Sequence, residues 1–341
     1  MRALAPLPLL LAAFLPPAGT GEGQRLIVLN KSDASAHLID PASGVLVREV
    51  ATGSGPHEGA VSPDGKLAVV TDYGQRQPGR TLTVIELTGE EPGSRTIELE
   101  GYSRPHGVVF LSDLKRVLVT AEDQQALIVV DVEAGTVVGS VKTEQGASHM
   151  VAVAPDERRA FVANIASGTM SAVDLVEMKL LANVATGAGA EGIAVRPGRA
   201  EVWVTNRSAG TVTVVDANEL EVLAQLPCEG FPIRVAFTPD GGRALVSAPR
   251  AGDVAVFDAE KRELLQRVPM RFELAEGSEE HLFAGRFGDS PVPIGVLVRP
   301  DGKVAYVANS GANLVAVLDL EQLKVVDAFE TGNEPDGMAW Y

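Results

Sequence analysis

The chain repeats one unit at a nearly constant spacing, and this period limits the possible folds more than any other feature of the sequence. Each unit carries a residue that precedes a short apolar run, as in "PHEGAVSPDG" at 56–65, "PHGVVFLSDL" at 105–114 and "SHMVAVAPDE" at 148–157. The equivalent positions, spaced by 49, 43, 42, 42, 61 and 42 residues, are His57, His106, His149, Glu191, Ile233, Ile294 and Asp336. A spacing this regular indicates a repeat protein with one supersecondary unit per period.

Each unit contains four short segments rich in β-branched residues, separated by turn signals. Segments such as "LAVVTD" at 67–72 and "TVTVVDA" at 211–217 show no helical period, which is typical of strands. Pro-Asp-Gly turns stand at 63–65, 239–241 and 300–302. Proline presets φ, aspartate bonds back to the backbone and glycine accepts a positive φ, so these are turns with a mechanism. Four strands in about 42 residues are the signature of a propeller blade.

The two ends of the chain complete one further unit. The stretch 25–53 supplies strands two to four of a unit without a first strand, and "EPDGMAWY" at 334–341 supplies only a first strand. Together they make a composite blade beside six complete units. The sequence therefore predicts an all-β, seven-bladed β-propeller with four antiparallel strands per blade. The C-terminal strand joins the N-terminal blade, which closes the ring and removes the open edge.

The repeated residues resemble a known family. "WVTN" at 203–206, "YVAN" at 306–309 and "FVAN" at 161–164, together with the "SPDG", "TPDG" and "RPDG" turns, are similar to the YVTN-repeat β-propellers. These are the YncE-like and pyrroloquinoline-quinone-associated secreted propellers. The resemblance covers nearly all of the chain after the N-terminal segment. It implies an exported seven-bladed propeller whose function is mostly unassigned or binding, because the repeated residues build blades.

The N-terminus predicts an export signal. Arg2 precedes an apolar stretch of 13 residues at 3–15, and small residues follow at 18–21. An apolar stretch of this length is too short to span a bilayer. We therefore expect a signal peptide at 1–21, a single propeller domain at 22–341, and a periplasmic or secreted mature protein without a membrane span.

The charge of the chain restricts its partners. The sequence has 29 basic and 45 acidic residues, a formal net charge of −16. Nucleic-acid binding needs clustered Lys and Arg that neutralise phosphates, so we expect no nucleic-acid partner. We expect an unidentified periplasmic ligand or protein instead, and a monomer, because a closed ring needs no partner to cover its edges. Cys228 is the only cysteine, which excludes an internal disulfide.

The aligned position opens the first strand of each unit, which in a propeller lines the central channel. Five adjacent units carry a polar group there, namely Asp336, His57, His106, His149 and Glu191, and the other two carry Ile. Imidazole and carboxylate are ligands of Zn and Cu, so His57, His106, His149 and Glu191 are the candidate set for a divalent metal. The alternative is that these side chains line a wet channel and bond to water or to a neighbouring blade.

A long insertion at 267–293 lies between strand four of one unit and strand one of the next. It therefore lies on the same face of the ring as the aligned position, and we call this the top face. Long loops in economical repeats often serve as lids or binding elements, and the alternative is a disordered acidic excursion. The candidate ligand-binding set gathers this insertion, the aligned position and other rim residues: His57, His106, His149, Glu191, Asp336, Tyr73, Arg207, Arg250, His281 and Arg286.

Three functional hypotheses remain open at this point. The favoured one is a binding module that presents its top face and channel mouth to a ligand or protein. The second is a metal-dependent lactonase or lyase that uses the rim of His57, His106, His149 and Glu191 to polarise a carbonyl or activate water. The third is a copper or quinone accessory protein. The chain has no Gly-rich phosphate loop, Gly-x-Ser-x-Gly elbow, CxxC pair or HExxH helix, so no catalytic residue is assigned.

Overall fold

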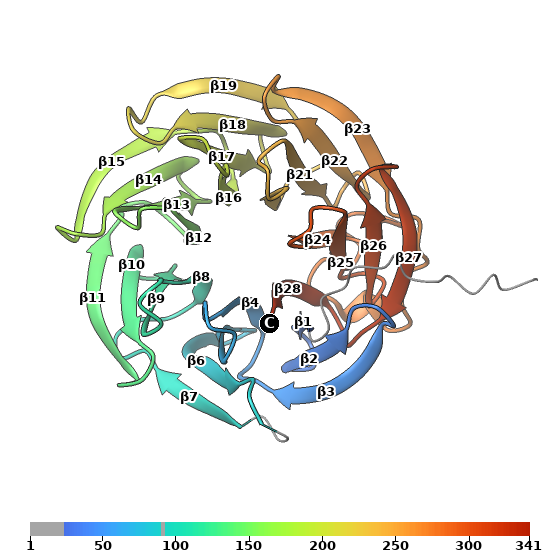
Figure 1. Cartoon of the computed structure of the whole chain (residues 1–341), viewed down its shortest axis with the longest axis horizontal. Coiled ribbons are helices and arrows are strands. Elements are labelled where there is room, and N and C mark those ends of the chain that lie inside the picture. The colour runs from blue at the N-terminus through green and yellow to red at the C-terminus, as the bar shows by residue number, and fades with distance from the viewer. Residues whose placement is uncertain (1–23, 90–92) are drawn as a thin grey trace, which may run out of the picture.

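The computed structural model of the chain describes residues 24–89 and 93–341. The predicted signal peptide at 1–21 lies outside the described residues. Seven four-stranded antiparallel sheets stand around a central axis, as Figure 1 shows. The prediction of an all-β, seven-bladed propeller is therefore confirmed.

Each blade runs from an inner strand at the channel to an outer strand at the rim. The inner strands are β4 (Pro56–Val61), β8 (Pro105–Phe110), β12 (Ser148–Val153), β16 (Ala190–Val195), β20 (Val235–Phe237), β24 (Pro293–Val298) and β28 (Pro335–Trp340). The second strands are β5 (Leu67–Gly74), β9 (Arg116–Ala121), β13 (Arg159–Asn164), β17 (Glu201–Asn206), β21 (Arg243–Ala248), β25 (Val304–Asn309) and β1 (Leu26–Asn30).

The outer half of each blade completes the sheet. The third strands are β6 (Pro78–Glu86), β10 (Ala126–Asp131), β14 (Thr169–Asp174), β18 (Thr211–Asp216), β22 (Asp253–Asp258), β26 (Leu314–Asp319) and β2 (Ser35–Asp40). The fourth strands are β7 (Ser94–Glu98), β11 (Thr136–Lys142), β15 (Lys179–Ala185), β19 (Val222–Pro227), β23 (Glu263–Pro269), β27 (Lys324–Glu330) and β3 (Val45–Ala51). Second strands are almost wholly buried between blades, whereas every second side chain of a fourth strand is exposed to solvent.

The composite blade closes the ring as the sequence predicts. Strand β28 pairs antiparallel with β1, and Trp340 lies opposite Leu26. At the end of this pairing the backbones of Arg25 and Tyr341 exchange two hydrogen bonds of 2.8 and 3.0 Å. The ends of the chain therefore hold each other in one sheet, with no open edge at the seam.

A β-bulge at the top of the inner strands aims the aligned side chains into the channel. In β4, Pro56 pairs with Asp72 and Gly59 with Val70, so His57 and Glu58 together face the single residue Thr71. The same shift of register occurs in β8, β12, β16, β24 and β28. A bulge of two residues against one bends the strand and redirects its side chains. The position that recurs in the sequence is thus a bulge position.

Hydroxyl groups of the second strands link this bulge to the next blade. Thr71 Oγ1 donates to the carbonyl of His106 at 2.8 Å and accepts the backbone N–H of Glu58 at 3.1 Å. Thr205 and Ser247 bond in the same way to the carbonyls of Ile233 and Ile294, at 2.9 and 2.7 Å. These bonds satisfy backbone groups that the bulge leaves unpaired, and they fix the height of each inner strand against its neighbour.

The inner strands pack so closely that most blades require glycine directly after the aligned position. A Cβ on Gly107 would lie 2.8–2.9 Å from backbone atoms of Val151 and His149 in the next blade. Gly192, Gly295 and Gly337 meet neighbouring backbone in the same way. The other three blades carry a long side chain at this position, namely Glu58, Met150 and Arg234.

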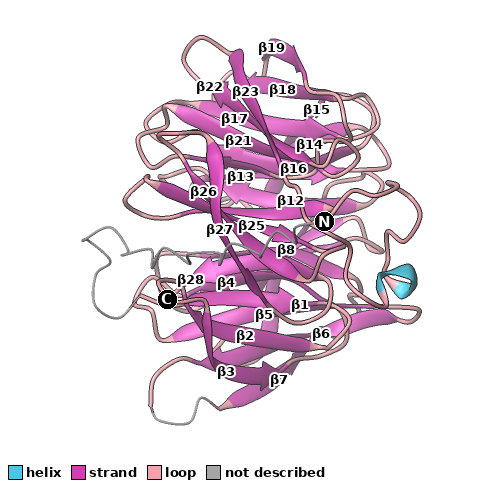
Figure 2. Ribbon diagram, turned by 90° about the vertical axis from the view of Figure 1, so that its right-hand side faces the viewer, coloured by secondary structure: helices cyan, strands magenta, loops and turns pink. Residues whose placement is uncertain are grey.

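The long insertion lies on one face of the ring, and Figure 2 shows its short helix η1 (Ser278–Glu280) standing out from that face. Its first and last predicted residues belong to β23 and β24, so the irregular segment is 270–292. The backbone N–H of Ala275 donates to the carbonyl of Gly311 at 3.0 Å, and that of Leu282 donates to Glu334 Oε1 at 2.6 Å. These contacts fasten the insertion to loops of the two following blades.

In the part of the chain that the structure covers, no helix combines the length and apolarity that a membrane crossing requires.

Candidate functional site

A pocket of about 760 Å³ opens at the mouth of the channel on the face that carries the insertion. The lining includes most of the predicted ligand set, namely His57, Tyr73, His106, His149, Glu191, Arg207, Arg286 and Asp336. Arg250 and His281 do not line it. Arg250 stacks on Phe231 behind the wall, with its Cζ 5.0 Å from the ring centroid, and His281 lies beside the lining residues Glu280 and Leu282. The structure thus brings eight of the ten predicted residues to one pocket.

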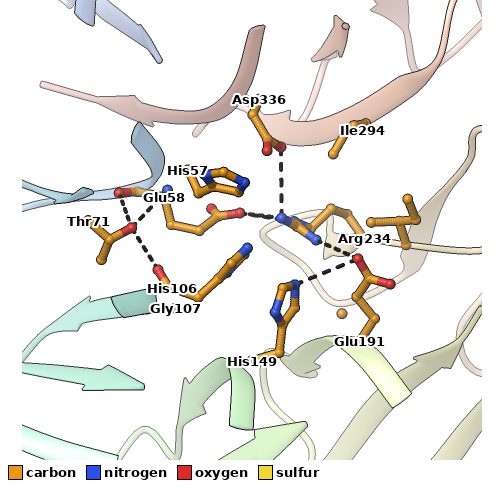
Figure 3. Close-up of polar contacts among 12 residues, drawn as sticks. His57, Glu58, Thr71, His106, Gly107, His149, Glu191, Arg234, Ile294 and Asp336 are labelled. Atoms are coloured by element: carbon orange, nitrogen blue, oxygen red, sulfur yellow. Dashed lines mark hydrogen bonds and ion pairs between the residues drawn. The ribbon is translucent and has the colours of Figure 1, made fainter. Parts of the chain in front are cut away.

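The guanidinium of Arg234 occupies the centre of the pocket floor, as Figure 3 shows. Its Nε and Nη2 donate to Glu58 Oε1 at 3.1 and 2.5 Å. Its Nη2 is 3.8 Å from Asp336 Oδ1, and its Nη1 is 3.8 Å from Glu191 Oε1. Burial opposes the charge of Arg234, but the three carboxylates outweigh burial and raise its pKa.

The contact between Glu58 and Arg234 crosses the channel. Glu58 comes from β4, Arg234 directly precedes β20, and the two residues are 176 positions apart in the chain. Glycine at the same position of four other blades leaves the room into which these two long side chains reach. The pair therefore bridges opposite sides of the channel and places Arg234 in the lining of the pocket.

Two further ion pairs hold the remaining carboxylates. Lys31 Nζ lies 3.2 Å from Asp336 Oδ2, and both side chains are buried. Arg207 Nη1 donates to Glu191 Oε2 at 2.7 Å. Burial raises the pKa of Asp336, but Lys31 and Arg234 outweigh it and hold that pKa below the ordinary value. Both carboxylates are therefore ionised at neutral pH.

His149 differs from the other two histidines at the mouth because two carboxylates face its ring. Its Nδ1 bonds to Glu122 Oε1, and its Nε2 is 3.6 Å from Glu191 Oε1. Burial lowers the pKa of His149, but the two carboxylates outweigh burial and raise it. Glu122 also accepts a hydrogen bond of 2.8 Å from the hydroxyl of Tyr73. Both ring nitrogens of His149 are thus engaged by carboxylates.

His57 and His106 are neutral. Burial, with a contribution from Lys31, lowers the pKa of His57 to about 4. Its Nδ1 lies 2.8 Å from the carbonyl of Gly55, so in the neutral ring Nδ1 carries the proton. Burial also lowers the pKa of His106 well below its ordinary value, and the charge of His149 adds to this. The rings of His106 and His149 stack with centroids 3.5 Å apart.

The donor set does not fit a divalent metal. Among residues 24–89 and 93–341, no group of three or more His, Cys, Asp or Glu side chains is arranged to hold one. Glu191 and Asp336 already contact Arg or Lys, and a guanidinium stands where their side chains meet. Because the rings of His106 and His149 stack, their nitrogens do not converge on one point, as metal coordination requires.

The pocket floor contains three buried polar atoms without a hydrogen-bond partner. They are His106 Nδ1, Arg234 Nη1 and Asp336 Oδ1, and their residues are 2%, 8% and 2% exposed. A buried polar atom left unpaired costs about 1–3 kcal/mol, so such atoms are rare unless water or a ligand completes them. All three residues line the pocket, which makes this floor the strongest candidate for a binding site.

The insertion explains why two blades carry Ile at the aligned position. Ile233 and Ile294 belong to an apolar cluster with Phe231, Phe287 and Val292. Phe287 comes from the insertion and is buried over this half of the ring. The five polar positions face the open half of the mouth, and the two apolar positions seat the insertion.

Arginines without a carboxylate partner stand around the opening. Arg104 lies over the ring of Tyr73, with its Cζ 4.8 Å from the centroid, and Arg286 lies 5.1 Å from the centroid of Phe231. Arg76, an exposed residue, also lines the pocket. Within the described ranges, none of these three, nor Arg250 behind the wall, forms an ion pair with a carboxylate.

Sequence reasoning missed Glu58 and Arg234, the two residues that close the floor. A signal was present, because the position after the aligned residue is glycine in four blades and charged in these two. Two charges of opposite sign, at a position that is glycine in four of the other five blades, indicate side chains that fill the space in front of the neighbouring strands.

Comparisons with known proteins agree with the architecture. Residues 104–271 match the model of a family described as YNCE-like beta-propeller. A functionally unknown protein from Desulfotomaculum acetoxidans is similar in structure, with a TM-score of 0.76, 13% identity, and coverage of 93% of this chain and 98% of that chain. Hydrazine synthase from Kuenenia stuttgartiensis is also similar, with a TM-score of 0.67, 16% identity, and coverage of 83% and 88%. No curated protein matches. Identities this low carry the fold alone.

Proposed function

Because the chain is a YncE-like β-propeller of seven blades, we propose that it is a binding module that takes a small polar ligand into the pocket at its channel mouth. The observation that carries this proposal is the set of three unpartnered buried atoms on the pocket floor. A pocket of about 760 Å³ lies in the range that accommodates small-molecule ligands.

The geometry favours binding over catalysis. A histidine that acts as general base needs a free nitrogen with a pKa near the working pH, whereas His149 has its Nδ1 bonded to Glu122 and its Nε2 3.6 Å from Glu191. His106 has a free nitrogen, but burial lowers its pKa well below neutrality. The metal-dependent lactonase or lyase and the copper accessory protein both need a metal that the donor set does not fit. A quinone accessory role has no residue of its own to support it.

The test is native mass spectrometry of the full-length chain, expressed with its own N-terminal segment and purified without a histidine tag. We expect a copurified small molecule on the native protein. We expect it to be absent from His106→Phe, which keeps the ring but removes the unpartnered nitrogen. The melting temperature of this variant should stay equal or rise, because the substitution removes one unpaired buried atom and creates none. Native protein free of any ligand, or equal loading of both proteins, would overturn the assignment of this site.

We further propose that the mature chain is exported and monomeric. The support is the apolar N-terminal segment of the sequence and the pairing of β28 with β1, which completes the seventh blade without a partner chain. Cell fractionation with N-terminal mass determination tests export, and light scattering tests the monomer. Recovery of uncleaved chain from the cytoplasm alone would contradict the first part.

A further inference from the structure

The charged groups at the pocket floor lie in ion pairs. Lys31, Arg207, Arg234 and His149 face Asp336, Glu191, Glu58 and Glu122, respectively. A charged ligand group among them would leave one buried charge without a partner, which is strongly unfavourable. The floor therefore suits a ligand group that forms hydrogen bonds and carries no charge.

The unpartnered atoms define which neutral group fits. Arg234 Nη1 offers only a donor and ionised Asp336 Oδ1 only an acceptor, whereas neutral His106 Nδ1 serves as either according to its tautomer. A hydroxyl accepts from Arg234 and donates to Asp336 at the same time. His106 lines the same pocket and offers a further nitrogen for a second hydroxyl group. The floor is thus matched to a hydroxylated carbon skeleton.

The mouth of the pocket favours a charged ligand group, unlike the floor. The chain has 45 acidic residues, yet Arg76, Arg104 and Arg286 line the pocket without a carboxylate partner among the described residues. Arg104 and Arg286 lie over the rings of Tyr73 and Phe231, with their Cζ atoms 4.8 and 5.1 Å from the ring centroids. A guanidinium recognises a carboxylate or phosphate through bidentate hydrogen bonds. Arginines held in this way suit an anionic group at the entrance.

We propose that the ligand is a hydroxylated organic anion, with its hydroxyl groups on the floor at Arg234, Asp336 and His106 and its negative group at the arginines of the mouth. This inference rests on the proposed binding function and adds the chemical class of the ligand. A carboxylate, as in a sugar acid, and a phosphate, as in a sugar phosphate, share the chemistry that the arginines recognise, and the experiment separates these two sources.

The test is isothermal titration of the full mature chain at low salt with five probes: D-gluconate, D-glucuronate, D-glucose 6-phosphate, neutral D-glucose and adipate, an acid without hydroxyls. At least one of the three hydroxylated anions should bind about tenfold more tightly than glucose and adipate, which each lack one of the two groups. Preference among the anions then decides between carboxylate and phosphate. Added salt should weaken the hydroxylated anion more than glucose.

Variants separate this inference from the binding function itself. Arg286→Gln should weaken the hydroxylated anion about tenfold and leave glucose unchanged. Arg158→Gln removes an exposed positive charge away from the pocket and should change neither. Equal affinity for glucose and the anions would overturn the anionic part, and equal affinity for adipate would overturn the hydroxyl part; both leave the binding function standing. No binding of any probe overturns the ligand class, while copurification of another molecule still supports the site.

Discussion

Asp72 allows the energetic cost of one buried carboxyl group to be measured. In four other blades the last residue of strand two is asparagine, and Asn206 shows its role: its Nδ2 donates to Thr211 and Thr213 at 3.0 and 2.9 Å. Asp72 stands at the same position and is 1% exposed. It accepts hydrogen bonds from Thr81 Oγ1 at 2.7 Å, Thr83 Oγ1 at 3.0 Å and the backbone N–H of Gly53 at 3.0 Å.

The pKa of Asp72 fixes the size and sign of the effect. Burial raises this pKa from 3.8 to about 6, against the opposing hydrogen bonds from Thr81, Thr83 and Gly53. A shift of about 2 pKa units corresponds to about 3 kcal/mol. Below pH 3.8 both the folded and unfolded chains hold the proton and there is no penalty. Between pH 3.8 and 6 only the unfolded chain ionises, so stability falls as pH rises, and above pH 6 the full penalty remains.

The substitution Asp72→Asn should therefore stabilise the protein at neutral pH and not at low pH. The two threonine hydroxyls can rotate to accept from the new Nδ2, as Thr211 and Thr213 do from Asn206. We expect the variant to gain about 3 kcal/mol relative to the native chain between pH 3.5 and 7.5, which is about 4 °C in melting temperature for a chain of this length.

The assay is differential scanning calorimetry of both proteins across this pH range. Other groups titrate equally in the two chains and cancel in the difference. The exposed Asp156→Asn is the matched control, because it makes the same chemical change outside the buried position. A difference between Asp72→Asn and the native chain that is the same at pH 3.5 and 7.5 would refute the argument.

Three other perturbations test the architecture of the ring and the floor. Arg234→Met should lower the free energy of unfolding by about 3–5 kcal/mol, because Glu58 is left as an uncompensated buried charge. The double variant with Glu58→Leu should recover part of this loss in urea unfolding. Strictly additive losses in the two single variants would contradict the interaction between Glu58 and Arg234. Burial lowers the pKa of His57 to about 4, so the unfolded chain binds its proton first and stability is lost as pH falls from 6.5 to 4, by about 3 kcal/mol. His57→Gln should remove this loss, and an unchanged pH profile of unfolding would count against it. Deletion of 335–341 removes β28 and should give an aggregating chain in size-exclusion chromatography, whereas an intact melting transition would disprove that this strand closes the ring.

The fold was predictable because its determinants are local and repeated. The residues of turns such as 63–65 and 239–241 determine their own backbone conformation, and each blade repeats the same pattern of four strands. Counting the units was then enough to join the two ends of the chain. The aligned position could be assigned to the channel mouth for the same reason, since one position of every repeat occupies one place in the ring.

The chemistry of the mouth could not be predicted in the same way. His149 and Glu191 are equally suitable as metal ligands or as members of ion pairs, and only the position of Arg234 distinguishes the two. Arg234 meets Glu58 across 176 residues of sequence, and no local period reports such a pairing. The role of Ile294 likewise depends on Phe287, which an insertion places against it.

The composite blade also determines which way the pocket faces when the protein is attached to a surface or a fusion partner near Arg25 or Tyr341. Strand β28 carries Asp336 at the pocket and ends at Trp340, and the next residue, Tyr341, bonds to Arg25 on the opposite face, as Figure 2 indicates by the separation of the C-terminus from η1. A tether, a fusion partner or a surface attached through Arg25 or Tyr341 would therefore leave the pocket facing outwards. Attachment at Arg25 or at Tyr341 gives the same orientation, with the mouth open to the surrounding solution.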